Sequence, residues 1–291
     1  MADAVTVVIP VRAPAPFFAG ALASVLDDAD AAEVIVIEDG TRELDESELG
    51  RARLIRLPPS GRSAARNAGV EAATSPLVAF LDADDRSLPG RLARQRDAIG
   101  TAPLTYGRVR VVDEAGRPHD EWNRLLARRF NRLAETRGTV EAVLATNCPI
   151  YTSAVVVGRD DFLAAGGYDT NLDAFEDLDL YLRLAERGPL VPTPGQAVTE
   201  YQLHGGNTPS RRLYEGSLYV AEKHLPGARG RTRRLLLARR VEALWGLGRF
   251  REARRAGLRA LAAEPRLAAS ASFGRRLATS LLPVRILEAR R

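Results

Sequence analysis

Short apolar runs alternate with amphipathic stretches along the first part of the chain. Each run is followed by a turn and then by a segment with helical periodicity, as in residues 62–73 and 88–100. The runs are rich in β-branched residues and apolar on both faces, so we expect a mostly parallel sheet flanked by helices, an α/β fold. The expected strands are residues 5–9, 34–37, 54–57 and 77–81.

Beyond about residue 210 the pattern becomes helical throughout. We therefore predict an α/β domain over residues 1–210 and an all-helical extension over residues 211–291. Within the extension, "ALWGLGRFREARRAGLRALAAEP" resembles one tetratricopeptide-like helical hairpin. The resemblance implies a turn at Leu247 to Phe250 and close helix packing at Ala253 and Ala260. It also implies that the second helix ends at Pro265.

Charge is distributed unevenly between these two parts. Residues 211–291 carry 20 Lys and Arg against 6 Asp and Glu, whereas the first 210 residues carry 22 against 31. The extension is therefore strongly basic, at +14, and the first part acidic, at −9. Lys223 is the one lysine of the chain and alanine is abundant, which indicates a GC-rich coding sequence. Abundant arginine is then weak evidence for nucleic-acid binding, and we predict none.

Composition bounds the class of protein further. A chain of 291 residues with 45% apolar and 27% charged residues can bury the core of one large domain plus a small one. No apolar run approaches the roughly 18 residues of a membrane span, and "MADAVTVVIP" lacks the features of a signal peptide. We expect a cytoplasmic protein. The single cysteine, Cys148, forms no internal disulfide or zinc cluster, and we expect it to pack.

Acidic residues gather where the expected strands end. Glu38 and Asp39 follow the second strand, and Asp82, Asp84 and Asp85 follow the fourth. Ligands of parallel sheets bind outside the carboxyl ends of the strands, so these acids are candidate site residues. A DxD triplet supplies hard oxygen ligands suited to Mg²⁺ or Mn²⁺ shared with substrate phosphates. The triplet alone is weak evidence, because aspartate is also common in turns.

Two familiar nucleotide-binding motifs are missing from the sequence. No GxGxxG follows the first strand and no GxxxxGK[ST] occurs, so neither a Rossmann site nor a P-loop is supported. Other short motifs, taken in order, resemble the family 2 glycosyltransferases with the GT-A fold over about residues 4–210. These motifs are "VVIPVRA", "VIVIEDGT", "GRSAARNAG", "FLDADD", "GGYD", "FEDLDLYLRLAERG" and "YQLHGGNTPS".

This resemblance implies a nucleotide-sugar donor bound by the first four motifs. It assigns Pro10 and Val11 to the donor site, Asp39 to the nucleotide base, Arg62 to base or phosphate, and Asp82 to ribose or metal. A carboxylate can accept the N3–H of uracil, and the positive end of a helix beginning at Arg62 attracts phosphate. The alternative for Asp39 is a turn-forming acid.

The resemblance also implies a divalent cation, Mn²⁺ or Mg²⁺, that bridges the diphosphate of the donor. Asp84 would be its essential ligand, and His204 lies where many relatives bring a histidine back to the metal or diphosphate. The alternative for His204 is an ordinary loop histidine. Asp85 is expected to cap the helix that begins near Leu88.

Asp177 corresponds to the catalytic base of the family. It would remove a proton from the acceptor hydroxyl during a single in-line displacement with inversion. The alternative is that Glu176 and Asp177 are acids favoured in the first turn of a helix. On the same helix, Asp179 and Arg183 are spaced for an ion pair.

Four other segments bear on the site. Arg66 and Asn67 are expected to support the loop at Arg62, and "GGYD" resembles a loop that closes over the donor, although its glycines can also simply end a helix. Arg12 stands where relatives often have an aromatic residue, and Glu38 where they have an aspartate. The helical stretch 115–146 lies near the acceptor in the family and is expected to set acceptor choice.

Together these features predict an inverting, metal-dependent glycosyltransferase that moves a sugar from a nucleoside diphosphate sugar, with UDP favoured, to a hydroxyl acceptor. The acceptor could be a glycan, a lipid-linked molecule or a small molecule. One alternative is a nucleotidyltransferase of similar fold, against which "ED" and "YQLHGGN" argue. Another is a catalytically silent sugar-nucleotide-binding or scaffold protein, against which Asp84 and Asp177 argue.

For the basic extension we predict peripheral contact with the inner face of an anionic membrane. Basic residues near such a surface contribute about 1 kcal/mol each. The final stretch alternates apolar residues with arginines in a way that suits an interfacial segment. The alternative is a soluble helix packed on the hairpin. The apolar residues concerned are Phe273, Leu277, Leu281, Leu282, Ile286 and Leu287.

Overall fold

The computed structural model describes residues 4–13, 15–40, 43–136, 138–204, 210–269 and 273. The chain forms two compact units. The first consists of Met1–Thr170 with Asp179–Asn207, and the second of Asn171–Leu178 with Thr208–Arg291. The division predicted from the sequence, an α/β domain over residues 1–210 and a helical extension over residues 211–291, stays a prediction.

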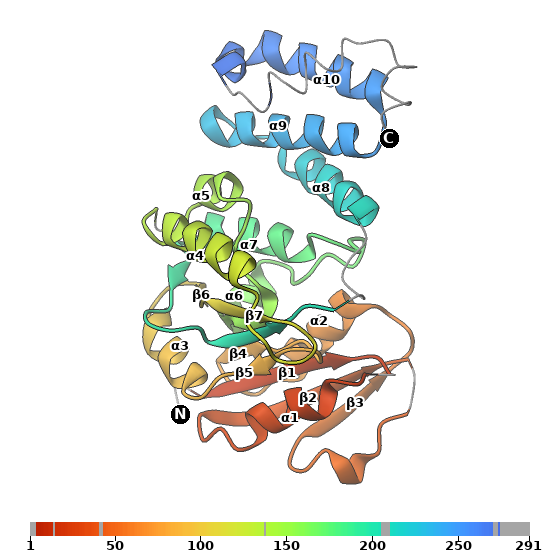
Figure 1. The fold of residues 1–291 in the computed structure, drawn as a ribbon, viewed down its shortest axis with the longest axis vertical. Coiled ribbons are helices and arrows are strands. Elements are labelled where there is room, and N and C mark those ends of the chain that lie inside the picture. Colours follow the sequence, from red (N-terminus) through yellow and green to blue (C-terminus); the bar gives the residue numbers. More distant parts are fainter. Residues whose placement is uncertain are drawn as a thin grey trace. The chain divides into compact units, whose positions relative to one another are not determined.

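The first unit is built on a seven-stranded sheet (Figure 1). Neighbouring strands run parallel except β8, which is antiparallel to both of its neighbours. The prediction of a mostly parallel sheet is therefore confirmed, as are the four expected strands. The order across the sheet is β3 (Arg53–Leu57), β2 (Ala31–Asp39), β1 (Val5–Val11), β4 (Leu77–Phe80), β8 (Val155–Gly158), β6 (Leu104–Tyr106) and β9 (Val191–Pro192).

The strand register brings the polar motifs to one edge of this sheet. Val11 pairs with Glu38 across β1 and β2, and Asp39 pairs with Leu57 across β2 and β3. On the other side of β1, Val8 pairs with Phe80, two residues before Asp82. Strand ends that are separate in sequence therefore meet at the carboxyl edge, where parallel sheets bind ligands.

Helices cover both faces of the sheet. The helices α1 (Phe18–Leu26) and α3 (Arg91–Ile99) share one buried apolar cluster with Val7 and Ile9 of β1. Val8 points to the opposite face, where it meets α2 (Arg62–Ala72) at Gly69. Because side chains alternate along a strand, both faces of β1 must be largely apolar. Its one polar residue, Thr6, is buried and donates to Glu33 Oε2 at 3.0 Å.

A small three-stranded sheet adjoins the main one. It consists of β5 (Arg86–Ser87), β10 (Thr199–Gln202) and β7 (Val109–Val112), with β10 in the middle. The helices α4 (Asp120–Ala134) and α5 (Val140–Ala145) confirm the helical stretch expected within residues 115–146. Two further helices are α6 (Arg159–Ala164) and α7 (Glu176–Arg187).

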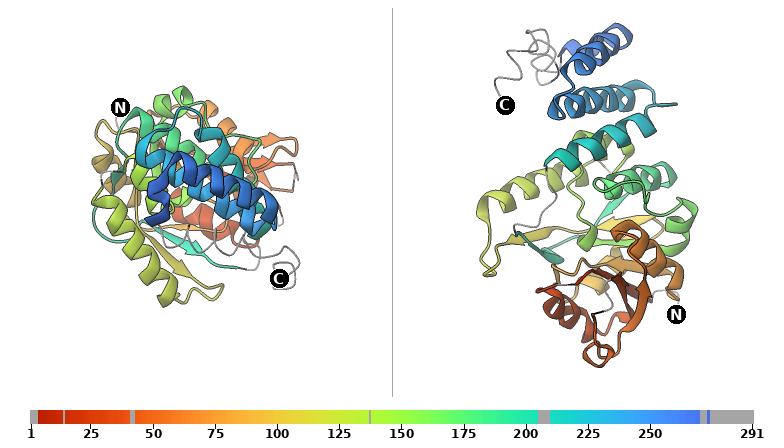
Figure 2. Two further views of the ribbon diagram at one scale, coloured as in Figure 1. Left: turned by 90° about the horizontal axis from the view of Figure 1, so that it is seen from above. Right: turned by 90° about the vertical axis from the view of Figure 1, so that its right-hand side faces the viewer.

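The described part of the second unit is mainly helical. The helices α8 (Ser210–His224), α9 (Gly230–Gly246) and α10 (Phe250–Ala263) pack in succession (Figure 2). The helical hairpin is confirmed: Gly248 turns the chain with φ of 74°, and Ala253 and Ala260 are buried between helices. No helix among the described residues has the length and apolar character needed to cross a membrane. The apolar residues predicted for interfacial contact after Phe273 lie outside the described residues.

Gly69 is where α2 approaches β1 most closely, and it provides a test of this packing. A Cβ at this position would lie 2.3 Å from Cγ1 of Val8, which is fully buried. Although alanine is the better helix former, overpacking of this kind typically destabilises by about 1–3 kcal/mol. We expect Gly69→Ala to lower the free energy of unfolding, measured by urea denaturation.

Gly20 in α1 is the matched control. A Cβ there would approach the Arg86 side chain at an ordinary 3.7 Å. We expect Gly20→Ala to stabilise the protein by up to about 1 kcal/mol. If both substitutions changed the free energy of unfolding in the same direction and by the same amount, the close approach of α2 to β1 would be contradicted.

Candidate active site

A pocket of about 480 Å³ lies at the carboxyl edge of the main sheet in the first unit. Its walls come from the ends of β1, β2 and β4, the start of α2 and the segment after β10. Seven of the eight residues assigned to the site from sequence line it. The lining residues are Pro10, Val11, Arg12, Ala15, Pro16, Phe17, Asp39, Gly61, Arg62, Ala65, Arg66, Asp82, Ala83, Asp84 and His204.

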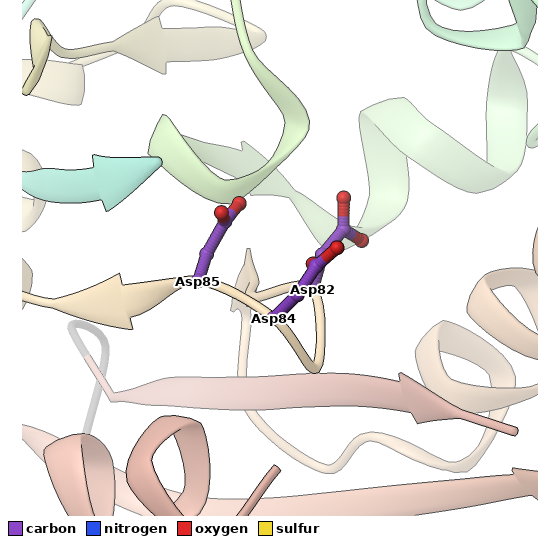
Figure 3. A group of neighbouring side chains, drawn as sticks. All are labelled: Asp82, Asp84 and Asp85. Carbon is purple, nitrogen blue, oxygen red and sulfur yellow. The ribbon is translucent and has the colours of Figure 1, made fainter. Parts of the chain in front are cut away.

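Three carboxylates cluster in the turn after β4. One oxygen from each of Asp82, Asp84 and Asp85 lies within 4.8 Å of the others. The turn is closed by the Asp85 N–H, which donates to the Asp82 carbonyl at 3.0 Å. Figure 3 shows the Asp82 and Asp84 side chains directed to the same side, with Asp85 set apart from them. The side chains of Asp82 and Asp84 are 31% and 41% exposed, whereas Asp85 is only 1% exposed.

Burial and neighbouring negative charge make ionisation of Asp84 and Asp85 unfavourable. Burial raises the pKa of the Asp84 carboxyl, and the charge of Asp82 raises it further, while the hydrogen bond with His204 acts in the opposite direction. Burial also raises the pKa of Asp85 well above its usual value, followed by the charges of Asp82 and Asp84. Positive charge placed beside these groups would therefore be stabilising.

Two buried arginines supply part of that positive charge. The Arg66 Nη2 donates to Asp82 Oδ1 at 2.5 Å, and the guanidinium carbon lies 5.3 Å from the centre of the Tyr168 ring. Arg91 is fully buried and donates to the carbonyl oxygens of Phe80 and Val155. Burial lowers the pKa of Arg91 to about 10, and the charge of Asp85 opposes this shift. Both arginines therefore belong to the electrostatic support of the acidic turn.

His204 meets the acidic turn from the other side of the pocket. Its Nε2 lies 2.8 Å from Asp84 Oδ2, and its ring centre lies 5.8 Å from that of Phe17. The two residues assigned to the metal from sequence are thus in direct contact. A hydrogen bond between an imidazole and a carboxylate also orients both groups.

Asp39 lines the pocket but also supports the loop beside it. Its Oδ1 accepts from the Ser60 N–H at 2.6 Å and its Oδ2 from the Gly61 N–H at 3.0 Å. Gly61 has a φ of 84° and immediately precedes α2, so this contact fixes the position where Arg62 begins the helix. Glu38 has a similar role, because its Oε1 accepts from the N–H of Leu44 at 3.0 Å.

Asn67 connects α2 to the "GGYD" segment. Its side-chain amide donates to the Tyr168 carbonyl at 2.9 Å and accepts from the Tyr168 N–H at 2.8 Å. Gly166 and Gly167 have φ of 85° and 66°, and their N–H groups bond to the last carbonyls of α6. The glycines therefore end a helix, which was the alternative interpretation of this segment.

The expectation that Asp85 caps a helix is wrong. The helix α3 begins at Arg91, and its N-cap is Gly90, which makes no side-chain capping bond. Asp85 Oδ1 instead accepts from the backbone N–H of Gln202 at 3.0 Å. The buried carboxylate thus ties the acidic turn to β10, the strand that leads to His204.

Asp177 lies in the segment 171–178, which groups with the second unit. It is half-buried in the first turn of α7, and its Oδ1 accepts the Leu178 N–H at 2.6 Å. The preceding Phe175 has a φ of 62°, unusual for an aromatic residue. Further along α7, the predicted ion pair is confirmed: Arg183 Nη2 lies 2.6 Å from Asp179 Oδ2.

Sequence reasoning missed two features of the pocket. Nothing in the pattern singles out Phe17, which lies in the turn directly before α1. It reaches the site because α1 packs beside β5, the partner of β10. The pairing of Arg66 with Asp82 was also missed, although the "ARN" motif indicated a supporting role. An arginine on the buried face of a helix needs an acidic partner, and the carboxylates at the strand ends were the candidates. This reasoning could have predicted the pairing of Arg66 with Asp82.

A family model described as Glycosyl transferase family 2 matches residues 6–158. This is more than half of the 291 residues, and the chain belongs to this family. The matched region contains the acidic turn and every lining residue of the pocket except His204.

Two curated relatives are similar over much of the same region. The chain is 31% identical over 206 residues to succinoglycan biosynthesis protein ExoU of Rhizobium meliloti (strain 1021), covering 63% of this chain and 57% of that protein. It is 30% identical over 138 residues to amylovoran biosynthesis glycosyltransferase AmsE of Erwinia amylovora, covering 46% and 48%. The chain therefore spans about half the length of these relatives.

Solved structures share the fold at low sequence identity. S. aureus TarS 1–349 in complex with UDP-GlcNAc matches with a TM-score of 0.64 and 14% identity, covering 95% of this chain and 90% of that one. The mannosyltransferase PcManGT of Pyrobaculum calidifontis, in complex with GDP-Man and Mn²⁺, matches with a TM-score of 0.60 and 19% identity, covering 98% and 86%. These likenesses confirm the GT-A fold.

The role of Asp39 in holding the loop can be tested separately from ligand binding. An asparagine keeps the shape but has one acceptor oxygen, so it cannot accept from both N–H groups. Loss of one such half-buried hydrogen bond costs about 0.5–1.5 kcal/mol. We expect Asp39→Asn to lower the free energy of unfolding by this amount in the absence of nucleotide, measured by urea denaturation.

Asp45 is the matched control, since its exposed Oδ1 accepts from the Ser47 N–H at 2.9 Å. Water can replace that contact, so Asp45→Asn should change stability by a few tenths of a kcal/mol, roughly the range of surface substitutions. A stability of Asp39→Asn equal to wild type would show that the loop does not depend on the carboxylate.

Proposed function

We propose that the protein is an inverting, metal-dependent glycosyltransferase that moves a sugar from a nucleoside diphosphate sugar to a hydroxyl acceptor. The observation that carries this proposal is the convergence of Asp39, Arg62, Asp82, Asp84 and His204 on one pocket. These residues come from separate strand ends and from the start of a helix. Their combination suits a ligand with a base, a ribose and a charged diphosphate.

The proposed donor carries uracil as its base. Asp39 faces the pocket with a carboxylate that has lone pairs beyond those used by Ser60 and Gly61, and it can accept the N3–H of a uracil. Arg62 stands at the N-terminus of α2, where a guanidinium and the helix dipole both attract phosphate. The TarS complex with UDP-GlcNAc supports UDP, and the PcManGT complex with GDP-Man supports nucleotide sugars in general.

The acidic turn fits a divalent cation. Asp82, Asp84 and His204 offer oxygen and imidazole ligands. Burial and the charge of Asp82 raise the pKa of Asp84, so a cation beside this carboxylate would be stabilising. Asp84 and His204, with Asp82, would hold Mn²⁺ or Mg²⁺, whose chemistry is to neutralise the charge of the departing diphosphate. The Mn²⁺ in the PcManGT complex supports this assignment.

Asp177 is proposed as the base. Its carboxylate would take the proton of the acceptor hydroxyl as the oxygen forms a bond to the anomeric carbon. The bond from that carbon to the diphosphate oxygen breaks, and the nucleoside diphosphate leaves with the bonding electrons. One displacement inverts the configuration. The left-handed backbone at Phe175 supports a functional role for this segment, because strained backbone conformations are often found at active sites.

The acceptor is proposed to be a hydroxyl of a glycan, a lipid-linked molecule or a small molecule. Residues 115–146, which contain α4 and α5, are proposed to set its choice. The relatives ExoU and AmsE carry names that refer to succinoglycan and amylovoran biosynthesis, which supports a role in polysaccharide or glycoconjugate synthesis.

Asp84→Ala should abolish metal-dependent donor binding while the fold survives, because this half-exposed side chain contributes little packing. A ligand that binds only the folded state raises its melting temperature. We would screen nucleoside diphosphates and nucleotide sugars by thermal shift, with and without Mn²⁺. The matched control is Asp97→Ala, an exposed aspartate of α3. If the Asp84 variant bound the cognate nucleotide with Mn²⁺ as tightly as wild type, the metal assignment would be wrong.

Asp177→Asn should retain donor affinity and lose transfer by a factor of about 10² to 10⁴, the usual contribution of a positioned base. The amide preserves the shape of the side chain but cannot take a proton. Release of nucleoside diphosphate in the presence of a panel of hydroxyl acceptors measures turnover, and thermal shift measures donor binding. Near-normal turnover would remove Asp177 as the base and direct attention to Glu176. Donor binding with no turnover by wild type on any acceptor would favour a silent sugar-nucleotide-binding protein.

A further inference from the structure

The outer side of α4 carries two large apolar side chains beside a group of arginines. Trp122 and Leu125 lie one helical turn apart and are 41% and 39% exposed. Arg129 and Arg132 continue the same stripe at spacings of four and three residues, and Arg128 lies next to it. We call these five residues the α4 stripe. None of its three arginines has an ion pair within the described part of the chain.

An adjacent face of α4 anchors the helix to the first unit. The Asn123 side chain bonds to both the N–H and the carbonyl of Val111 in β7, at 2.8 and 3.0 Å. Phe130 is buried, with its ring 5.4 Å from that of Tyr106 and the Arg108 guanidinium 4.4 Å from its centre. The helix is therefore held by residues other than the α4 stripe, of which Arg129 is half-buried and the other four residues are exposed.

The helix that carries the α4 stripe packs on β7, and the end of β7 pairs with the end of β10, the strand that leads to the pocket. Val112 at the end of β7 pairs in register with Gln202 of β10, and its carbonyl accepts the N–H of Leu203 at 2.8 Å. His204 follows directly. A surface bound by the start of α4 would therefore lie near the edge of the fold where the pocket is formed.

We propose that the α4 stripe docks the protein on an anionic lipid surface. Tryptophan favours the interface between headgroups and acyl chains, leucine adds apolar contact, and arginines attract anionic headgroups. The charge of the stripe complements such a surface. A second copy of the chain fits less well, because a symmetric contact would set arginines against arginines. Docking itself does not depend on the proposed function. The implication that the acceptor is presented at a membrane does rest on it.

Tryptophan fluorescence gives a direct readout, because the chain has two tryptophans, Trp122 and Trp245. In a full-length Trp245→Phe variant, the emission reports Trp122 alone. With vesicles of phosphatidylglycerol and phosphatidylcholine we expect a blue shift and quenching by brominated acyl chains. Neither effect is expected with pure phosphatidylcholine. Unchanged emission with anionic vesicles would overturn the proposal.

Co-sedimentation with the same vesicles tests the charges. Neutralising Arg128, Arg129 and Arg132 together to glutamine should weaken binding roughly tenfold or more, as should high salt. The double variant Trp122→Ala, Leu125→Ala should also lose binding, whereas Leu163→Ala, an equally exposed leucine on α6, should not. Binding by all of these variants as tightly as wild type would contradict docking through α4.

The basic helices of the second unit provide a matched control. Arg251, Arg255 and Arg259 are exposed on one side of α10, and their change to glutamine removes the same charge. If this triple variant lost vesicle binding and the α4 variants did not, docking would belong to the C-terminal helices and the proposal for α4 would be wrong. Binding to soluble nucleic acid or acidic polysaccharide but not to vesicles would also overturn it.

Donor binding keeps this test separate from the proposed function. The α4 variants are outside the pocket, so their thermal shift with nucleotide and Mn²⁺ should equal that of wild type. Vesicle binding is measured without turnover. A protein that bound vesicles through α4 but no nucleotide sugar would support the docking surface and contradict the glycosyltransferase assignment.

Discussion

The mutual repulsion of three carboxylates in the turn after β4 is the constraint on which the site depends. Asp82, Asp84 and Asp85 place oxygens within 4.8 Å of one another, which is unfavourable unless positive charge or hydrogen-bond donors stand nearby. The protein supplies them from several directions. Arg66 from α2 pairs with Asp82, His204 contacts Asp84, and the Gln202 N–H satisfies Asp85. Segments far apart in sequence are thereby brought to one turn.

The same contacts connect the pocket to its surroundings. Arg66 lies against the Tyr168 ring, and its neighbour Asn67 holds the Tyr168 backbone through two hydrogen bonds. The first turns of α2 thus link the acidic turn to the segment after α6. Asp39 holds the loop at the other end of this link, where Arg62 begins the helix. Each of these contacts is buried or half-buried, so salt weakens it less than it weakens pairs on the surface.

The GT-A fold explains why these polar groups can be held in place. The sheet is largely apolar on both faces and covered by helices, so hydrophobic packing dominates the rigid part of the unit. Polar side chains buried within it, such as Arg91 and Thr105, are hydrogen-bonded. The polar groups stand at its carboxyl edge, where backbone groups leave the sheet and a ligand can approach. The fold is shared with TarS and PcManGT at 14% and 19% identity, so it is compatible with large differences in sequence.

The sequence by itself determined the features that depend on local pattern. Apolar runs such as "VTVVI" and "VIVI" specify buried parallel strands, and the helical hairpin at Gly248 follows from spacing of small residues and one turn. Pro10, Asp39, Asp82 and Asp84 could be assigned to one site because parallel strands end at one edge. Only the tertiary structure decided which partners the polar groups of the site contact. Asp85 looked like a local helix cap, yet it bonds to Gln202, 117 residues away, and Phe17 reaches His204 through the packing of the chain. Such pairings are set by how elements pack, and a buried carboxylate takes whichever donor that packing brings, which no local pattern encodes.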